Sequence, residues 1–471
     1  MSDINKDTAY ADEEEIIEPA IHSNNHEILN GPIVKNLFRL AWPVMIGNTM
    51  QVLYNLADTF WLGKLGAEAV AALSIGFPLV FFMISIGAGI TIAGTTLVAQ
   101  YMGSRNIKMA NKITGQIFTS VTILSIILAI IGILLNGKIL QLMGAPENIF
   151  ADANAYLNII FGGIPFMFAF FIFSALLRGY GDTKSPMKMM IFSTILNIII
   201  DPFLIFGIGF FPELGVRGAA YATVFSRAVA GLAGIYLLFT GRKGLTLTLK
   251  SLKPDFKEIK KIMKLGLPSA GEHSIVSLGM TVLMSIVSQF GTMVVAAFGI
   301  GSRILSVVML PSRGFATATT TMVGQNLGAE QTDRAEKSAW VSSGIILILL
   351  TVLAFLFNLF PKTIISVFNT NPEVIKIGTS FLRIVGCSFG FLGVRFIIGG
   401  SFRGAGNTVI AMIMAIIALW GIRLPLAQFL GITLGWGTKG IWWGMFFSNF
   451  LTAIIAAIWF KRGGWKEKAI E

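Results

Sequence analysis

Long apolar runs, separated by short polar segments, follow one another along most of the chain. Residues 121–135, 189–211, 344–360 and 445–460 are examples. A helix of about 20 apolar residues crosses the roughly 30 Å hydrocarbon core of a bilayer. Divided at glycines, prolines and charges, the runs predict an all-α integral membrane protein with 12 transmembrane helices, at 36–61, 67–99, 112–136, 150–177, 187–210, 216–240, 262–289, 293–322, 337–358, 373–402, 409–432 and 437–460.

The second half of the chain repeats the first at a constant offset of 225 residues. LAWP at 40–43 aligns with LGLP at 265–268, and RGYGDT at 178–183 aligns with RGAGNT at 403–408. Each half holds six predicted spans, so both halves enter the membrane from the same side. This predicts two six-helix lobes related by a pseudo-two-fold axis along the membrane normal, as in parallel-repeat transporters. A duplicated membrane protein of another kind is the alternative.

The polar segments set the expected domain boundaries and the orientation. Lys and Arg gather in the loops on the side that holds both termini, which the positive-inside rule assigns to the cytoplasm. We therefore expect a multi-pass protein of the inner or plasma membrane with both termini in the cytoplasm. The expected parts are a disordered acidic tail at 1–32, an N-terminal lobe at 33–240, a basic linker at 241–261, a C-terminal lobe at 262–460 and a cytoplasmic tail at 461–471.

Composition agrees with a membrane setting and narrows the partners. The chain is 54% hydrophobic and only 13% charged, with a mean hydropathy of +0.75, whereas soluble proteins carry about 25% charged residues. The net charge of +12 comes from the loops, and no basic face carries the aromatic residues of a nucleic-acid-binding protein. We expect no nucleic-acid partner. A single cysteine, Cys387, excludes an internal disulfide.

Two predicted spans carry polar stripes that end in a carboxylate. The spacing is three, four and three on the first span and three and four on the fifth, so each stripe follows one helical face: Asn48, Gln51, Asn55 and Asp58, and Thr194, Asn197 and Asp201. Pro202 cannot donate to the carbonyl of Ile198, which is left for another partner. If the stripes face each other, they form an oxygen cage for Na⁺ or a network that holds a proton. The alternative is that Asp58 lies solvated or paired at the membrane edge.

Other charged positions inside the predicted spans give weaker signals. Glu272, beside His273, is a candidate contact for substrate or a second ion, or an acid near the cytoplasmic vestibule. Position 283, equivalent to Asp58, is Leu, so we expect the coupling chemistry in the first lobe only. We expect the arginines within spans to snorkel or cap helices rather than bind ligand; they are Arg227, Arg303, Arg313, Arg383, Arg395 and Arg423.

Four segments carry a resemblance to a known family. They are QVLYNLADT at 51–59, LRGYGD at 177–182, NIIIDP at 197–202 and GAAYAT at 218–223. With the duplicated layout, they make the chain, over about residues 30–462, resemble the multidrug and toxic compound extrusion (MATE) transporters, most of all their prokaryotic DinF-like branch. The resemblance implies a V-shaped pair of six-helix lobes that exports amphipathic, often cationic, compounds in exchange for H⁺ or Na⁺.

The resemblance also implies a set of site residues in the first lobe. The cation site of the DinF-like branch matches Asp58, Asn197, Asp201 and Thr223, with Gln51 and Tyr54 beside it, and Asn55 is added from the polar stripe. Ser174 departs from the pattern, because close family members can carry Asn in this network. The sodium-site acids of the NorM-like branch find no clear match in the second lobe.

The function expected from this reasoning is an antiporter that works by alternating access. H⁺ or Na⁺ neutralises Asp58 and Asp201, spans one and five rearrange with Pro43 and Pro202 as bend points, and the drug is released. We expect a monomer that needs no cofactor beyond the coupling ion. The alternatives are a flippase for lipid-linked oligosaccharide of the same superfamily and, more remotely, an integral-membrane enzyme, for which no paired metal-ligand or acid–base motif is found.

Overall fold

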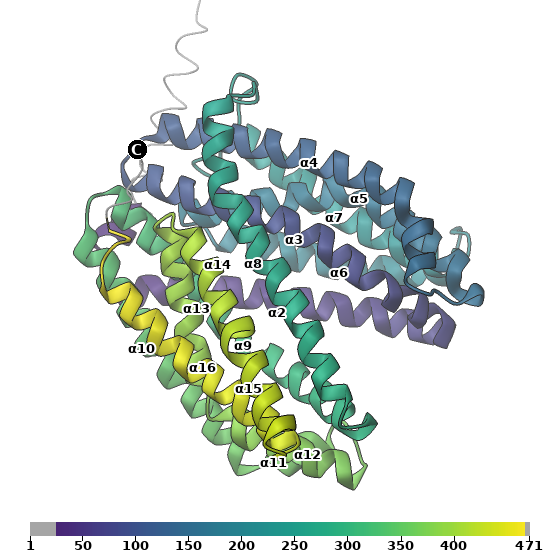
Figure 1. Ribbon diagram of the computed structural model, residues 1–471. Helices are drawn as coiled ribbons and strands as arrows, with labels where there is room; N and C mark the ends of the chain where they lie inside the picture. Colours follow the sequence, from purple (N-terminus) through teal and green to yellow (C-terminus); the bar gives the residue numbers. More distant parts are fainter. Residues whose placement is uncertain (1–24, 467–471) are drawn as a thin grey trace, which may run out of the picture. The chain divides into compact units, whose positions relative to one another are not determined.

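A computed structural model describes residues 25–466, and every regular element in that range is a helix (Figure 1). The helices follow the apolar runs of the sequence and end at glycines or at short polar turns. In chain order they are α2 (Ile33–Leu65), α3 (Ala67–Gly103), α4 (Ile107–Leu142), α5 (Glu147–Tyr180), α6 (Lys184–Phe206), α7 (Val216–Phe239), α8 (Phe256–Ser288), α9 (Thr292–Gly328), α10 (Thr332–Leu359), α11 (Pro361–Ser366), α12 (Pro372–Gly386), α13 (Phe389–Gly404), α14 (Thr408–Ile416), η1 (Ile417–Arg423), α15 (Leu424–Gln428), η2 (Phe429–Thr433) and α16 (Thr438–Lys461).

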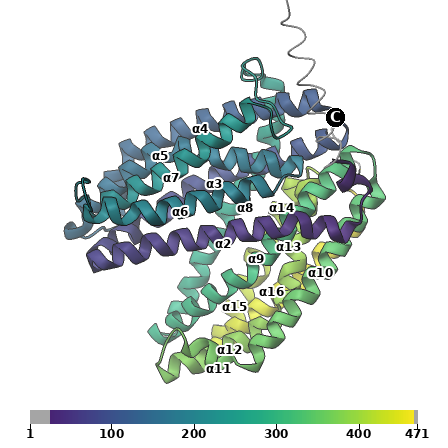
Figure 2. The ribbon, with the colours of Figure 1, turned by 180° about the vertical axis from the view of Figure 1, so that it is seen from behind.

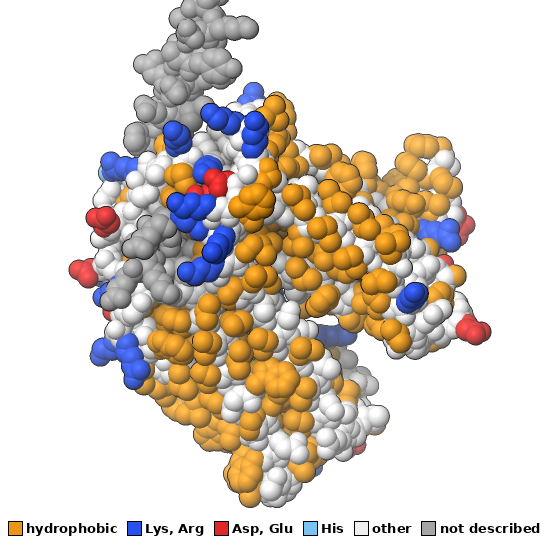
Figure 3. Space-filling view, turned by 45° about the horizontal axis from the view of Figure 1, so that its top comes forward, with side chains coloured by type: hydrophobic (Ala, Val, Ile, Leu, Met, Phe, Trp, Pro, Cys, Tyr) orange, Lys and Arg blue, Asp and Glu red, His pale blue; other side chains and the backbone are white. Residues whose placement is uncertain are grey.

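The number of spans agrees with the prediction of 12 once two special cases are considered. Within residues 25–466, ten stretches are long and apolar enough to cross a membrane, and α12 with α13 makes an eleventh if this pair, bent by 52°, is one span. The remaining predicted span is α2, whose polar stripe lowers its hydropathy. Hydrophobic side chains cover much of the helical surface in Figure 3, as expected for helices that face lipid.

Contacts divide the described chain into two compact units. The first contains residues 25–32 and Ile46–Gly266, and the second contains Ile33–Met45 and the chain from Leu267 onward. The structure therefore differs from the predicted lobes in two respects, because the first turns of α2 pack with the second unit and the first turns of α8, up to Gly266, pack with the first unit. Phe38 meets Phe315 edge to face with ring centroids 5.1 Å apart, which accounts for this exchange.

The duplication predicted from the sequence is visible in the packing of both units. In the first unit, α5 packs against α3, α4 and α7 (Figure 2), and Thr95 donates to the carbonyl oxygen of Ala175 at 2.9 Å. In the second unit, α13 packs against α9, α10 and α16, and Thr320 donates to Gly400 at 2.8 Å. The two hydrogen bonds lie 225 residues apart, so the repeat extends to individual contacts.

The helix α6 differs in backbone geometry from its counterpart in the second unit. In the first unit, α6 is a regular helix with Pro202 in its last turns. Its counterpart in the second unit contains two π-helical segments, η1 and η2, on either side of the short α15. Each π-helical turn widens the helix and changes the direction in which later side chains point.

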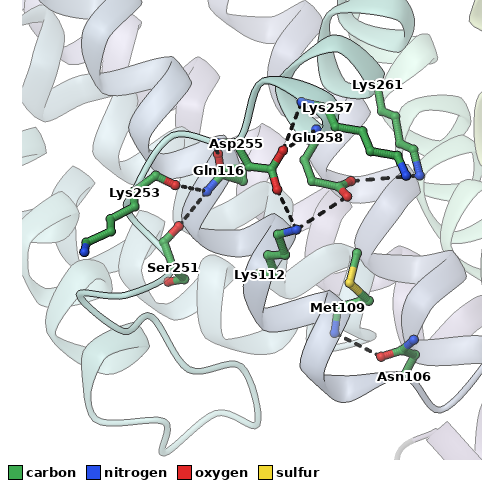
Figure 4. A network of polar contacts seen from close by, with 10 residues as sticks. All are labelled: Asn106, Met109, Lys112, Gln116, Ser251, Lys253, Asp255, Lys257, Glu258 and Lys261. Atoms are coloured by element: carbon green, nitrogen blue, oxygen red, sulfur yellow. Dashed lines mark hydrogen bonds and ion pairs between the residues drawn. The ribbon is translucent and has the colours of Figure 1, made fainter.

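The linker between the halves is bound to the first unit (Figure 4). Gln116 on α4 donates to the carbonyl oxygens of Ser251 and Lys253 at 2.8 and 2.7 Å and accepts from the backbone nitrogen of Asp255 at 2.7 Å. Lys112 pairs with Asp255 at 2.7 Å. Because α8 already begins at Phe256, the irregular linker is shorter than the predicted 241–261.

The predicted tails are also shorter than expected. Residues 25–30 are helical, with Ile28 and Leu29 buried, and Asn25 donates to the carbonyl oxygen of Met102 at 2.7 Å. At the other end, Trp465 is buried against Phe460. In both places apolar side chains inside a polar stretch drive the packing. The rest of the predicted tails, at 1–24 and 467–471, lies outside the described residues.

Candidate cation-binding site

Two buried carboxyl groups meet inside the first unit, one from α2 and one from α6. Asp58 is 8% exposed and Asp201 is fully buried, and their carboxyl groups are close enough to share a hydrogen bond. Thr223 on α7 donates to Oδ2 of Asp58 at 3.3 Å. Asn197, one turn before Asp201, donates to Oδ1 of Asp201 at 3.0 Å. The four residues that the family resemblance assigned to one site thus lie together.

Each carboxyl group has one oxygen without a donor. Among the described residues, Oδ1 of Asp58 and Oδ2 of Asp201 are buried and have no hydrogen-bond partner, and the same holds for Oδ1 of Asn197. Two ionised carboxylates in contact repel strongly where the dielectric is low. A proton shared between the two carboxyl groups, or a cation bound by the three oxygens, would remove both the repulsion and the unsatisfied acceptors.

The donor set suits a proton or a small hard cation. It consists of carboxylate, amide and hydroxyl oxygens, which alkali and alkaline-earth ions prefer over nitrogen or sulfur ligands. In the described part of the chain, no group of three or more His, Cys, Asp or Glu side chains is placed to hold a metal ion. Two acids carry little charge for a divalent ion, so a monovalent cation is the better match.

A buried arginine lies near the carboxyl pair. Arg227 on α7 is 2% exposed, and its Nη2 donates to Oε1 of Gln51 at 2.6 Å. Its guanidinium lies 4.4 Å from the ring centroid of Tyr54, whose hydroxyl lies 2.7 Å from Oγ of Ser226. The positive charge of Arg227 would oppose a second positive charge nearby and would therefore weaken the binding of a cation at the carboxyl pair.

Sequence reasoning missed the role of Arg227, which it grouped with arginines that snorkel or cap helices. The structure instead places Arg227 in the interior, bonded to Gln51, so the snorkelling prediction was wrong for this residue. The available signal was its position, because it follows Ser226 in the middle of an apolar span. Tyr54 and Gln51, predicted beside the site, do lie there.

Asn55 and Ser174, which were predicted as members of the site, do not lie at the carboxyl pair. The side chain of Asn55 is exposed, and among the described residues it is joined to the group by the hydrogen bond that it accepts from Gln51 at 3.2 Å. Ser174 on α5 is buried, but among the described residues its hydroxyl has no hydrogen-bond partner. Neither contacts the carboxyl pair through a hydrogen bond. Their predicted roles in the network stay predictions, as do the bends at Pro43 and Pro202.

Glu272 lies in the other unit and has a basic partner. Nη1 of Arg403 lies 3.1 Å from each of its two carboxylate oxygens, and both side chains are more than four-fifths buried. The predicted contact of Glu272 with substrate or a second ion stays a prediction. Any ligand there meets an existing ion pair rather than an isolated acid.

Comparison with known proteins places these features in a family. The MatE family model matches the chain twice, over residues 43–203 and 268–429. The two matches begin at Pro43 and Pro268, which are 225 residues apart, as the internal repeat requires.

Relatives match over almost the whole chain. A probable multidrug resistance protein, YoeA of Bacillus subtilis, is 32% identical over 91% of this chain and 93% of its own length. A protein named FAD transporter from Shewanella oneidensis is 30% identical over 92% of this chain and 95% of its own. Among solved structures, a MOP superfamily transporter from Pyrococcus furiosus superposes with a TM-score of 0.85 at 27% identity, covering 93% of this chain and 97% of that one.

Proposed function

The chain belongs to the MATE family of multi-pass membrane transporters, and from this premise we propose that it exports amphipathic, often cationic, organic compounds in exchange for H⁺ or Na⁺. Such proteins move their substrates without transforming them, so no catalytic group is required. Several relatives carry names that refer to multidrug resistance or export, which supports a cargo of small organic molecules.

The observation that carries the proposed coupling is the contact between Asp58 and Asp201. Within residues 25–466, no donor reaches one buried oxygen of each carboxyl group, so one shared positive charge would satisfy both carboxyl groups. Binding and release of that charge give the first unit two electrostatic states. An antiporter needs such states, because cation and drug must not be free to cross independently.

The proposed cycle links these states to transport. A cation that enters from outside neutralises the pair, α2 and α6 rearrange near Pro43 and Pro202, and the drug loses its site and leaves. The protein then opens to the cytoplasm, the cation leaves with help from the charge of Arg227, and a new drug molecule binds. Each charge moved inward gains about 2.3 kcal/mol per 100 mV, equivalent to about a fifty-fold gradient.

We also propose an orientation and an assembly. Both termini lie in the cytoplasm, because the basic linker and the other Lys-rich and Arg-rich loops are on their side of the predicted topology. The working form is a monomer, because the proposed coupling site consists of residues from a single unit of one chain.

A liposome experiment tests the proposal. The protein is reconstituted with rhodamine 6G, a fluorescent organic cation, and a pH gradient and a Na⁺ gradient are imposed separately. Asp201→Asn is compared with wild type, and Asp152→Asn is the control, because Asp152 is an exposed acid of the same unit outside the site.

We expect one gradient to drive rhodamine 6G in wild type and in Asp152→Asn but not in Asp201→Asn, and the effective gradient names the coupling ion. If neither gradient drives rhodamine 6G in wild type, the antiport proposal is wrong. Full coupling in Asp201→Asn would leave an antiporter but remove the carboxyl pair as its coupling site.

A further inference from the structure

The linker between the halves carries exposed lysines and exposed large apolar side chains within a few residues of one another. Leu249 is 77% exposed, and Phe256, the first residue of α8, is 84% exposed. Four lysines between or just beyond them are also exposed, and the six residues together are called the linker patch: Leu249, Lys250, Lys253, Phe256, Lys257 and Lys260. Basic and hydrophobic side chains lie next to each other around the linker, near the top of Figure 3. This mixture is typical of segments that lie on a membrane surface.

The backbone of the linker patch is fixed against α4, so the exposure of its side chains is a property of the fold. In addition to the hydrogen bonds drawn in Figure 4, Thr119 on α4 donates to the carbonyl oxygen of Leu252 at 3.0 Å. Oγ of Ser251 donates to the carbonyl oxygen of Thr248 at 2.7 Å, which closes a turn with Leu249 at its tip. The leucines at positions 245 and 247, in the same linker, are buried. The linker thus packs some of its apolar residues and leaves those of the patch uncovered.

The acids of this segment do not neutralise the linker patch. Residues 242–264 contain eight Lys or Arg and two acids, and both acids have partners outside the patch (Figure 4). Asp255 pairs with Lys112 at 2.7 Å. Glu258, which is buried, lies 3.7 Å from Nζ of Lys112 and 4.0 Å from Nζ of Lys261. Within residues 25–466, no ion pair includes a lysine of the linker patch, so the described chain leaves its positive charge uncompensated.

The attachment to α4 places the linker patch at the edge of the apolar zone. On the face of α4 that continues from Thr119, three isoleucines are 46% to 53% exposed: Ile123, Ile126 and Ile130. An α-helix rises about 1.5 Å per residue, so Ile123 lies about 6 Å from Thr119 along the axis. Exposed apolar side chains of a spanning helix face lipid. The linker, bound at Thr119, therefore lies about one helical turn from the lipid chains, at the depth of the headgroups.

We propose that the linker patch binds anionic phospholipid headgroups at the cytoplasmic surface of the membrane, and that Leu249 and Phe256 insert among the lipid chains. An anionic surface attracts nearby lysines, and a lysine can lay its stem along apolar groups while its charge reaches a phosphate. The inference uses the orientation proposed above, but it does not depend on the cargo or on the coupling ion. Because Phe256 is the first residue of α8, such binding anchors the start of this helix at the membrane surface.

Lipid binding to the full-length protein tests the charged part of the patch. Purified protein in a neutral detergent is titrated with dioctanoyl phosphatidylglycerol, an anion, or with dioctanoyl phosphatidylcholine, which has no net charge, and native mass spectrometry gives both affinities. The linker variant combines Lys250→Gln, Lys253→Gln, Lys257→Gln and Lys260→Gln. The control variant changes the net charge equally by replacing with Gln four exposed lysines at the opposite ends of the predicted spans: Lys64, Lys138, Lys362 and Lys376.

Each lysine near an anionic surface contributes about fivefold to affinity. Because detergent retains only part of that effect, we expect the linker variant to bind phosphatidylglycerol about tenfold or more weakly than wild type does. The control variant should bind it as wild type does, and phosphatidylcholine should bind equally to all three proteins. Equal phosphatidylglycerol affinities of the two variants would overturn the proposal. Displacement of phosphatidylglycerol by glycerol 3-phosphate, which has no chains, would show a site for free phosphate and would also overturn it.

A fluorescence experiment tests the apolar part of the patch independently. In a Cys387→Ser background, which has no other cysteine, Leu249→Cys is labelled with bimane, and the protein is placed in nanodiscs that contain phosphatidylglycerol with brominated chains. Ser104→Cys is the control, because Ser104 is exposed and precedes α4, whose first residue, Ile107, lies about 14 Å from Gln116 along the helix. We expect the brominated lipid to quench bimane at position 249 and not at position 104. Equal quenching of the two labels, or quenching of neither, would contradict insertion of the linker patch.

Discussion

Asp58→Asn is expected to remove coupling while leaving the protein folded. In wild type, Oδ2 of Asp58 accepts from Thr223 at 3.3 Å, and Oδ1 faces no donor. An amide at this position keeps an oxygen for Thr223 and offers its N–H₂ to the unsatisfied oxygen of Asp201. The variant therefore imitates the loaded pair permanently, and no cation needs to bind.

The expected size of the effect follows from the number of carboxylate oxygens that lack a donor. Among the described residues, one oxygen on each carboxyl group lacks a donor, and one shared cation would satisfy both, so we expect one coupling cation per cycle. With the membrane potential held at zero, a tenfold gradient of that cation, about 1.4 kcal/mol, sustains at most about tenfold accumulation of a monovalent organic cation. In Asp58→Asn the accumulation ratio falls to about one.

Liposomes clamped with valinomycin and equal potassium on both sides give this ratio directly from the steady-state distribution of rhodamine 6G. Thermal unfolding of the purified variant, monitored in parallel, checks that the fold is kept. Accumulation well above tenfold in wild type would show that more than one cation is coupled per cycle and would refute the argument that the two carboxyl groups share one cation. Tenfold accumulation in a folded Asp58→Asn variant would refute the same argument.

Two further predictions follow from the packing of the first unit. Gly163→Ala places a Cβ against the methyl groups of Val224, the neighbour of the Thr223 that donates to Asp58. We therefore expect transport to fall by more than in the control Gly162→Ala, whose added Cβ meets no atom within 4 Å. Equal transport rates in the two variants would contradict this prediction. Lys112 holds the pKa of Asp255 below its usual range, so the linker contact should persist above the ordinary aspartate pKa of about 3.9 and be lost only as pH falls through the lowered value. Hydrogen-exchange protection of the Asp255 amide, corrected for intrinsic exchange, measures this, and loss of protection already near pH of about 6 would contradict the assigned cause.

Much of the fold was predictable because the bilayer constrains the sequence so strongly. Apolar runs of spanning length, the constant offset of the repeat and the family motifs together indicate twelve helices in two lobes. The meeting of Asp58 with Asp201 was predictable for a similar reason, since polar groups at membrane depth require polar partners. The pattern on α2 and α6 contained both halves of that contact.

The remaining features depend on how helices rotate and pack, which spacing alone does not determine. Asn55 shares the polar stripe of α2, but the buried side of this helix is set by Tyr54 and Asp58, whose partners Ser226 and Thr223 lie on α7. The direction of the Arg423 side chain was hidden for another reason. Arg423 lies at a π-helical turn, where helical periodicity no longer tells which way a side chain points.

The crossing of α2 and α8 between the units has a consequence for how the chain is assembled. The division between units falls within α2 just after Pro43 and within α8 just before Pro268, so each half of the sequence begins with a segment that completes the unit formed by the other half. A half-length ancestor with this packing would have existed as an arm-exchanged pair rather than as an independent monomer. For the same reason, two fragments produced by cutting the chain at the linker should fold when co-expressed, and neither should fold when expressed by itself.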